Sequence, residues 1–286
     1  MVFPSLYDAV ETVSADSQGT FLRVRGAEYS ALVLAAAFGL MPNGELGHVG
    51  ALAAVAFFLA ALVLRLSGAG ETAEKRWYDA RAAAESIKSS SWQYAVGGGA
   101  FPLTDVSSSQ RFVDFLHGVL NTLPHLDVPA EARTGLAVTS EMNAIRTSDR
   151  PQRTAVYVVE RVEDQLRWYE SKANLNKRRA RQWRRALVLA EAAAVAVGLL
   201  RVANVFDVDW LALLAAVAAS IAAWQQLKNY TSLSEAYSVT SHEVQLVNSS
   251  LGAQANESDW AQAVADAETA FSREHTLWLS RRQRPQ

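Results

Sequence analysis

The residue types that most often carry catalysis are present in this sequence, but none has the spacing that a catalytic or metal-binding motif requires. The dipeptide His242-Glu243 is not followed by the second histidine of a zinc-protease motif. No Gly-x-Ser-x-Gly elbow surrounds any serine. No pair of histidines has the i, i+4 or short-loop spacing of metal ligands; the five are His48, His117, His125, His242 and His275. We therefore predict a protein that is not an enzyme and that needs no cofactor.

The composition excludes several further classes of function. The chain has 286 residues and no cysteine, which excludes a disulfide framework, thiolate metal sites and cysteine nucleophiles. Its net charge of −2 provides no overall basic field for nucleic acid. The run Gly97-Gly98-Gly99 could cradle a phosphate, but no Lys-Ser/Thr pair follows it. We therefore interpret this run as a flexible loop that ends a helix.

Three ionisable residues lie inside or beside apolar segments, where charge is expensive. Glu191 lies one and a half turns into such a segment, and a carboxylate that faces lipid costs about 2.5 kcal/mol or more. It could line a pore, or it could pair near the membrane surface with a cation such as Arg185 or Lys228. Arg65 and Arg201 lie near segment ends, where long side chains reach the headgroups. We keep Glu191, Arg65 and Arg201 as candidate pore or intramembrane charges.

Four apolar segments, arranged in two pairs, are candidates for membrane helices. The first pair covers residues 29–41 and 51–66, and the second covers residues 186–200 and 210–224. Spanning a bilayer takes about 20 apolar residues, with about 17 as a practical minimum, so each segment needs its flanking residues. The pattern predicts two transmembrane hairpins; the alternative is a set of buried helices in a soluble bundle.

The charges that flank these segments favour the membrane and give a direction. Six basic residues lie between residues 177 and 185, whereas the turn of the first hairpin has none and that of the second has only Arg201. By the positive-inside rule both turns lie outside and both termini lie in the cytoplasm. Trp183, Trp210 and Trp224 are typical of interfacial aromatic belts. Frequent alanine and glycine in the segments allow close helix packing and predict a homo-oligomer.

The rest of the chain reads as helices punctuated by Gly and Pro, with no convincing strand. The expected helices cover residues 71–94, 108–123, 131–148, from Pro151 into the third apolar segment, 224–247, and a last helix around residues 260–271. A heptad-like stripe runs through the helix that begins at Pro151 and predicts that it packs on a neighbouring helix. Its members are Val159, Val162, Leu166, Tyr169, Ala173, Asn176, Ala180 and Trp183.

Three blocks of spaced aromatic and charged residues resemble the SLATT family. The first is Lys75-Arg76-Trp77-Tyr78-x2-Arg81-x3-Glu85-x-Ile87-Lys88-x3-Trp92-x-Tyr94. The second is Tyr157-x3-Arg161-x3-Gln165-x2-Trp168-Tyr169-x2-Lys172-Ala173-Asn174. The third is Ala236-Tyr237, Glu243, then Glu268-x2-Phe271-x-Arg273-Glu274-His275-x2-Trp278. The whole looks like a chain in which two SLATT units stand in tandem, covering nearly everything beyond about residue 25.

The resemblance implies a function. SLATT domains are two-transmembrane effectors associated with bacterial nucleotide-signalling defence systems, and they are proposed to perforate the inner membrane. For this chain it implies an antiviral, pore-forming effector of the bacterial inner membrane. The expected partners are the lipid bilayer, further copies of the chain and a separate cytoplasmic nucleotide sensor or synthase; no nucleic acid is expected. The alternative is a membrane-anchored helical scaffold that docks a cytoplasmic partner without forming a pore.

The motif residues have two possible roles, as structural contacts between helices or as part of a trigger. In the structural interpretation the tryptophans wedge between helices, while Arg81–Glu85 and Arg161–Gln165 hold crossing helices in register. In the trigger interpretation the motif residues bind a ligand directly. The set is Trp77, Arg81, Glu85, Lys88, Trp92, Arg161, Gln165, Trp168, Tyr169, Lys172, Tyr237, Glu268, Glu274 and Trp278.

The predicted architecture is therefore an all-α, multi-pass integral membrane protein with two transmembrane hairpins, four membrane helices in all, and long cytoplasmic helices forming a bundle. The expected parts are an amphipathic N-terminal segment (1–26), hairpin 1 (27–66), a cytoplasmic helical region (67–150), a long helix leading into the membrane (151–185), hairpin 2 (186–224) and C-terminal cytoplasmic helices (225–286).

Overall fold

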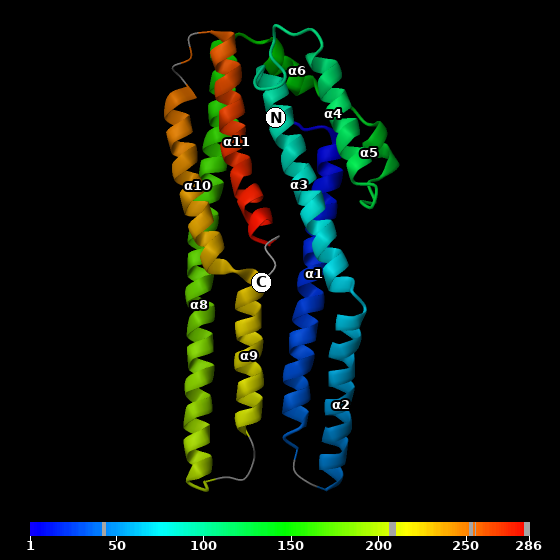
Figure 1. Ribbon diagram of the computed structural model, residues 1–286, viewed down its shortest axis with the longest axis vertical. Coiled ribbons are helices and arrows are strands. Elements are labelled where there is room, and N and C mark those ends of the chain that lie inside the picture. The colour runs from blue at the N-terminus through cyan, green and yellow to red at the C-terminus, as the bar shows by residue number, and fades with distance from the viewer. Residues whose placement is uncertain (42–43, 206–209, 252–253, 255, 283–286) are drawn as a thin grey trace. The chain divides into compact units, whose positions relative to one another are not determined.

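The computed structural model describes residues 1–41, 44–205, 210–251, 254 and 256–282, with side chains described as far as Phe271, apart from those of Thr122 and Ser250. Within these residues the chain is all-α and contains no strand, as predicted. The helices, shown in Figure 1, are α1 (Ser5–Phe38), α2 (Glu45–Leu66), α3 (Ala69–Val96), α4 (Ser108–Thr122), α5 (Ala130–Thr134), α6 (Ser140–Thr147), α7 (Arg150–Tyr157), the π-helical turn η1 (Val158–Val162), α8 (Glu163–Val202), α9 (Trp210–Lys228), α10 (Tyr230–Leu251) and α11 (Glu257–Arg282).

The chain folds into two compact units, each built from separate stretches of sequence. Unit 1 comprises Met1–Ser17, Lys75–Asn174 and Ser234–Gln286, and unit 2 comprises Gln18–Glu74 and Leu175–Leu233. Helices α1, α3, α8 and α10 contribute residues to both units. A single continuous helix therefore joins the start of α8 in unit 1 to its apolar end in unit 2.

The core of unit 1 is built where α3 and α4 bury their apolar faces against the start of α1. Ala80, Ala84 and Ile87 follow one another at spacings of four and three, so they lie on one face of α3. Phe112 of α4 is fully buried in the same cluster, and Leu6 of α1 is 4% exposed there. The helical periodicity of the sequence thus sets which side chains form this core.

Unit 2 contains two helix hairpins whose helices approach closely. In the first, the Phe38 and Phe57 rings stack with centroids 5.5 Å apart. A Cβ atom on Gly50 of α2 would lie 2.6 Å from the carbonyl oxygen of Phe38, so glycine is required for this approach. In the second, the Trp183 and Trp224 rings lie 6.3 Å apart and join α8 to α9. Aromatic contacts join the helices of both hairpins, and in the first a glycine also lets the helix backbones approach closely, as expected for packing in lipid.

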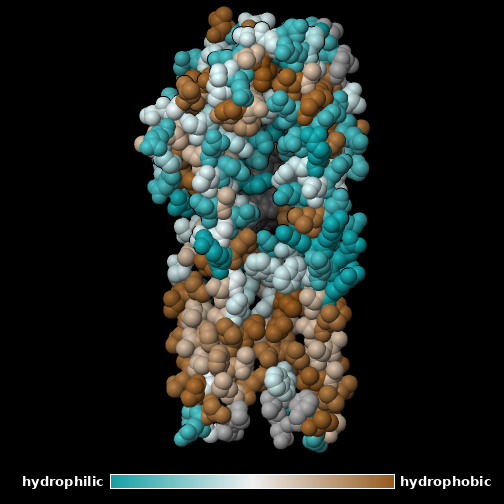
Figure 2. Space-filling view, turned by 180° about the vertical axis from the view of Figure 1, so that it is seen from behind, coloured by the Kyte–Doolittle hydropathy of each residue, from teal (hydrophilic) through white to brown (hydrophobic). Residues whose placement is uncertain are grey.

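The helices of unit 2 expose apolar side chains that a soluble protein would bury. Leu52 is 72% exposed and Leu189 is 70% exposed. Figure 2 shows hydrophobic residues gathered over the region that α2, α9 and the ends of α1 and α8 occupy. Among the described residues, two helical stretches are long and apolar enough to cross a membrane, Glu45–Leu66 and Trp210–Ser249.

The first and third predicted segments are helical but lie within helices that carry more charge. Residues 29–38 end α1, which includes Arg23, Arg25 and Glu28 shortly before them. Residues 186–200 lie in α8, which includes Arg185, Glu191 and Arg201. Both segments are continuous helix. They differ from Glu45–Leu66 and Trp210–Ser249 because of these charges.

Two predicted helices are interrupted. The helix expected over residues 131–148 is wrong, because α5 ends at Thr134, the following Gly135 has extended backbone, and α6 begins only after Thr139. The Thr139 side chain accepts a hydrogen bond from the Met142 backbone N–H (3.2 Å) and caps α6. The helix expected over residues 224–247 breaks at Asn229, whose φ of 45° separates α9 from α10.

The heptad-like stripe that begins at Val159 is correct from Val162 onward but wrong at its first member. Val162, Tyr169 and Ala173 are buried, whereas Val159 is 54% exposed. The π-helical turn η1 is the reason, because its wider turn shifts the register of the residues before Val162. Tyr157 takes the buried position that the periodicity assigns to Val159.

Candidate functional site

The π-helical turn aligns the residues of the second motif block. Tyr157, Arg161 and Gln165 are spaced by four, and in a regular α-helix each step of four turns the side chain by about 40°. A π-helical turn has more residues per turn, so this spacing keeps side chains on one face. All three residues are buried, with Arg161 only 3% exposed. Such turns often occur at functional positions.

Two of these aligned residues, Tyr157 and Arg161, bind one carboxylate on α11, and Gln165 binds Arg161. Arg161 Nε donates to Glu268 Oε1 (2.9 Å), and Arg161 Nη2 donates to Glu268 Oε2 (2.6 Å). The Tyr157 hydroxyl donates to Glu268 Oε1 (2.9 Å), and Arg161 Nη1 donates to Gln165 Oε1 (3.2 Å). Glu268 is 1% exposed, so the ion pair is bidentate and withdrawn from water. We call Tyr157, Arg161, Gln165 and Glu268 the buried clamp.

Aromatic rings enclose the buried clamp on several sides. The guanidinium carbon of Arg161 lies 4.8 Å from the centroid of the Phe271 ring. Tyr157 contacts Trp92 edge-on at 5.9 Å and Trp260 at 6.0 Å. The rings exclude water, which strengthens the ion pair and makes the loss of either partner expensive.

The charges of the clamp shift the pKa values of groups around it. Burial alone would lower the pKa of the Arg161 guanidinium, but the adjacent Glu268 carboxylate outweighs burial and holds that pKa above its ordinary value. Burial, and then Glu268, raise the pKa of the Tyr157 hydroxyl. Burial and the positive charge of Arg161 lower the pKa of Lys88. The surroundings of the clamp therefore keep the Arg161 guanidinium charged and the Tyr157 phenol neutral across the physiological range.

Other residues of the second and third motif blocks form a second contact zone on α8, α10 and α11. The Trp168 and Tyr237 rings meet edge-on at 5.4 Å. The Tyr169 hydroxyl donates to the Phe271 carbonyl oxygen (3.0 Å), and Lys172 Nζ lies 5.5 Å from the centre of the Trp168 ring. The structure thus brings residues of the second and third blocks together as contacts between helices.

The first motif block lies apart from this zone, on α3. Trp77 stacks on Tyr78 with centroids 4.4 Å apart, and Arg81 lies 3.9 Å from Glu85 one turn further on. Lys88 is half-buried and lies near enough to the clamp to be affected by Arg161. Trp92 is the member that reaches the clamp directly, through Tyr157. Two further motif residues, Glu274 and Trp278, have side chains outside the described residues.

In unit 2, the candidate intramembrane charges have different surroundings. Arg65 pairs with Glu28, its Nε donating to Glu28 Oε1 at 2.8 Å. Arg201 is exposed near the end of α8. Glu191 is exposed on α8, and no ion pair joins it to any cation among the described residues. The structure therefore does not bring Glu191, Arg65 and Arg201 together as one site.

Sequence reasoning missed Glu28, a deeply buried carboxylate of unit 2. It is 1% exposed and accepts hydrogen bonds from Arg65 and from Arg25 Nη1 (3.0 Å). Arg25 also donates to Glu71 Oε1 (2.8 Å). Glu28 immediately precedes an apolar segment, and arginines lie near the start and the end of the same hairpin. A carboxylate in that position needs a cationic partner, and this was the signal that could have identified it.

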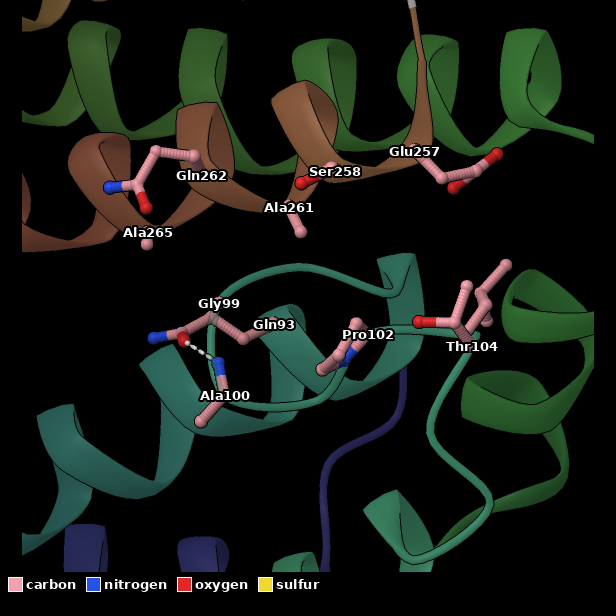
Figure 3. Close-up of a pocket in the computed structure, with 11 residues that line it drawn as sticks. Gln93, Gly99, Ala100, Pro102, Thr104, Glu257, Ser258, Ala261, Gln262 and Ala265 are labelled. Atoms are coloured by element: carbon pink, nitrogen blue, oxygen red, sulfur yellow. Dashed lines mark hydrogen bonds between the residues drawn. The ribbon is translucent and has the colours of Figure 1, made fainter.

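A pocket of about 450 Å³ lies in unit 1 between the loop that follows α3 and the first turns of α11. Figure 3 shows Gln93 and Gln262 facing it from opposite sides, with the Ala100 backbone N–H donating to Gln93 Oε1 (3.4 Å). Glu257 at its edge accepts hydrogen bonds from Arg153 Nη2 (2.7 Å to each oxygen). Its lining combines amides, hydroxyls and this carboxylate with apolar residues such as Leu103 and Ala261.

The glycine run beside this pocket has a packing role. A Cβ atom on Gly98 would lie 2.4 Å from Cγ1 of Val264 on α11. The Gly99 backbone N–H donates to the Ala261 carbonyl oxygen (2.8 Å). The Trp260 indole N–H donates to the Val96 carbonyl oxygen (2.8 Å). The loop expected here thus serves to bring the end of α3 into direct contact with α11.

Two family models match the chain, one in each half. Residues 4–154 match the model described as SMODS and SLOG-associating 2TM effector domain 3. Residues 157–278 match the model described as SMODS and SLOG-associating 2TM effector domain 1. No curated protein and no solved structure matches the chain. The first match contains α1 and α2, and the second contains α8 and α9, so each match includes one hairpin.

Proposed function

The chain belongs to the SMODS and SLOG-associating two-transmembrane effector (SLATT) family as a tandem of two such domains, and we propose that it acts by assembling into a homo-oligomer that permeabilises the bacterial inner membrane. It is a membrane protein whose family consists of effector domains of conflict systems. A pore is the most direct way in which paired hairpins without an attached catalytic motif could exert an effect on a cell.

The exposure of the two most apolar helices carries this proposal. In the most apolar part of α2, 17% of the residues are buried. In the most apolar part of the stretch that begins at Trp210, none is buried. The core helix of a soluble protein would bury most of such residues. An exposed apolar surface of this extent calls for lipid or for further copies of the chain.

The apolar ends of α1 and α8 complete the proposed four-helix arrangement. Each lies in a hairpin with a helix that meets the criterion for a membrane span. Glu28 in the first hairpin is neutralised by arginines, which lowers the cost of placing it at the membrane edge. The basic residues 177–185 precede the second, so both turns are proposed to lie outside and both termini in the cytoplasm.

The buried clamp supplies a route by which a cytoplasmic signal would reach the membrane. It ties α11 to the turn η1, and η1 continues directly into α8, whose far end is the third apolar segment. A partner that displaces α11 would remove the counter-charge of Arg161 and free the start of α8. We propose that this partner is a cytoplasmic nucleotide sensor or synthase, and that unit 1 is its docking domain.

The experiment is controlled expression in a bacterial host with membrane potential and propidium uptake measured in the same cells. Depolarisation should follow induction of the chain. The matched control is Leu214→Arg, which places a charge within α9 and opposes insertion by about 2.5–3.5 kcal/mol. If the chain reaches the membrane and cells remain polarised, the hairpins only tether the cytoplasmic helices, and the scaffold function replaces the pore.

A further inference from the structure

The stretch of α8 that precedes its apolar end carries an unusual density of positive charge. Six of nine consecutive residues are basic, and all six side chains are exposed. They are Lys177, Arg178, Arg179, Arg181, Arg184 and Arg185. Lys228 at the end of α9 lies close enough to Arg179 for their like charges to repel. We call these seven residues the basic collar.

The positive charge of the collar is not compensated within the described residues. None of the seven has a carboxylate within ion-pairing distance there. The first hairpin differs, because Arg25 pairs with Glu28 and Glu71, and Arg65 also pairs with Glu28. Of the two hairpins in unit 2, the second therefore leaves its cations available for an external anion.

The collar borders directly on apolar surface. Val188 and Leu189, one turn beyond Arg185, are 56% and 70% exposed. Trp183 lies among the collar residues and packs 6.3 Å from Trp224, and Lys228 Nζ lies 5.8 Å from the Trp224 ring. Tryptophan and lysine beside an exposed apolar surface are typical of the headgroup level of a membrane.

The collar surrounds the helix instead of forming a concave site. Consecutive residues of an α-helix point about 100° apart, so Lys177, Arg178 and Arg179 project in three directions. A soluble polyphosphate would be bound best by cations that converge on one point. A plane of headgroups meets the helix on all its exposed sides, which is the distribution that the collar has.

We propose that the basic collar is a binding site for anionic phospholipids of the cytoplasmic leaflet. Phosphate and glycerol-phosphate headgroups pair with the arginines, while the acyl chains lie along the exposed apolar side chains of α8 and α9. Attraction of basic residues to anionic lipid is electrostatic and weakens as salt increases. The second hairpin thereby depends on the lipid composition of the membrane, and the first, with its internal ion pairs, does not.

The test uses the purified full-length chain in a neutral detergent, titrated with phosphatidylglycerol or with phosphatidylcholine. Lipid adducts are counted by native mass spectrometry, and the melting temperature is measured in parallel. The collar variant Arg178→Gln/Arg179→Gln/Arg181→Gln should bind phosphatidylglycerol at least tenfold more weakly than the wild type. The lysine variant of the same three positions, which keeps the charges, should bind within about twofold of the wild type.

The matched control removes three exposed arginines outside the collar, as Arg23→Gln/Arg133→Gln/Arg167→Gln, so the net charge changes equally. It should bind phosphatidylglycerol as the wild type does. Equal weakening in the control, or unchanged binding by the folded collar variant, overturns the proposal. The proposal is also overturned if ATP or inorganic polyphosphate raises the melting temperature of the lipid-free protein as much as phosphatidylglycerol does. Lipid binding is measured without any permeation, so this result stands apart from the test of the proposed pore.

Discussion

Arg161 and Glu268 are 107 residues apart in the chain and form a buried bidentate ion pair, with hydrogen bonds of 2.9 and 2.6 Å. Each is at most 3% exposed. The pair joins α11 to the helix that continues into the second hairpin. Two charges withdrawn from water in this way depend on each other, which makes the pair a sensitive point in the proposed control of the protein.

Breaking the ion pair from one side should destabilise unit 1 strongly. Glu268→Gln leaves Arg161 buried without a counter-charge, and we expect the free energy of unfolding to fall by about 3–5 kcal/mol. Removing both charges with Arg161→Met/Glu268→Leu should be less harmful than the sum of the single changes. Denaturant unfolding followed by circular dichroism measures both. A double variant as unstable as that sum would show that the two residues act independently.

An exposed pair on the same helix provides the comparison. Arg167 lies 3.6 Å from Glu163 on the surface of α8. Since exposed ion pairs contribute little, Arg167→Ala should change the free energy of unfolding by less than about 1 kcal/mol. The difference between this result and that of Glu268→Gln isolates the effect of burial.

Contact between α3 and α11 depends on the absence of a side chain at position 98. Gly98→Ala places a Cβ atom 2.4 Å from Val264 Cγ1, and we expect a loss of about 1–3 kcal/mol of stability. The additional change Val264→Ala should recover part of this loss by creating space. Gly118→Ala in α4 is the control, because its Cβ atom would meet nothing within 4 Å and alanine favours helix. If Gly98→Ala unfolds no more easily than Gly118→Ala, the close contact is not present in solution.

Alkaline pH should destabilise unit 1 through Tyr7. Burial, followed by the negative charges of Glu11 and Glu85, raises the pKa of Tyr7 from 10.0 to about 12. The unfolded chain then releases this proton first, so the stabilisation is fully present below pH 10 and is lost as pH rises through about 12. Unfolding measured between pH 9 and pH 12 should show a steeper decline for the wild type than for Tyr7→Phe. Equal slopes would contradict the assignment.

Glu28 should hold the two ends of the first hairpin together. Glu28→Ala leaves Arg25 and Arg65 facing each other without their shared carboxylate, and we expect about 1–3 kcal/mol lower stability of unit 2. The melting temperature of detergent-solubilised protein measures this. Glu45→Ala, at an exposed position at the start of α2, should change it little. Equal effects at both positions would mean that the Glu28 ion pairs contribute nothing specific.

Much of the helical architecture follows from punctuation in the sequence. The helix expected over residues 108–123 is α4 to within one residue, and the one expected over residues 71–94 extends by two residues at each end. The break between α5 and α6 was harder to see, because it depends on a Thr139 cap that competes with a continuous helix. Asn229 is similar: its positive φ separates two helices within a stretch that has no Gly or Pro to predict a break.

The candidate site could be predicted only in part. The three blocks identified Arg161, Gln165 and Glu268, but spacing along a chain does not say which residues meet across helices. The π-helical turn η1 was not predicted, because a spacing of four residues fits an α-helix as well as a π-helix. Glu28 was missed for a different reason. Arg25 lies three residues before it, whereas Arg65 lies 37 residues after it, and only the folded hairpin brings all three together.

The most direct test of the central claim is the accessibility of single cysteines to a membrane-impermeant maleimide, which is clean because the chain has no cysteine of its own. Glu45→Cys and Val205→Cys, beside the two hairpin turns, should be labelled in intact spheroplasts. Glu131→Cys in unit 1 should be labelled only after the cells are opened. Protection of Val205→Cys in spheroplasts, or labelling of Glu131→Cys in them, would contradict the account of two hairpins that cross the membrane.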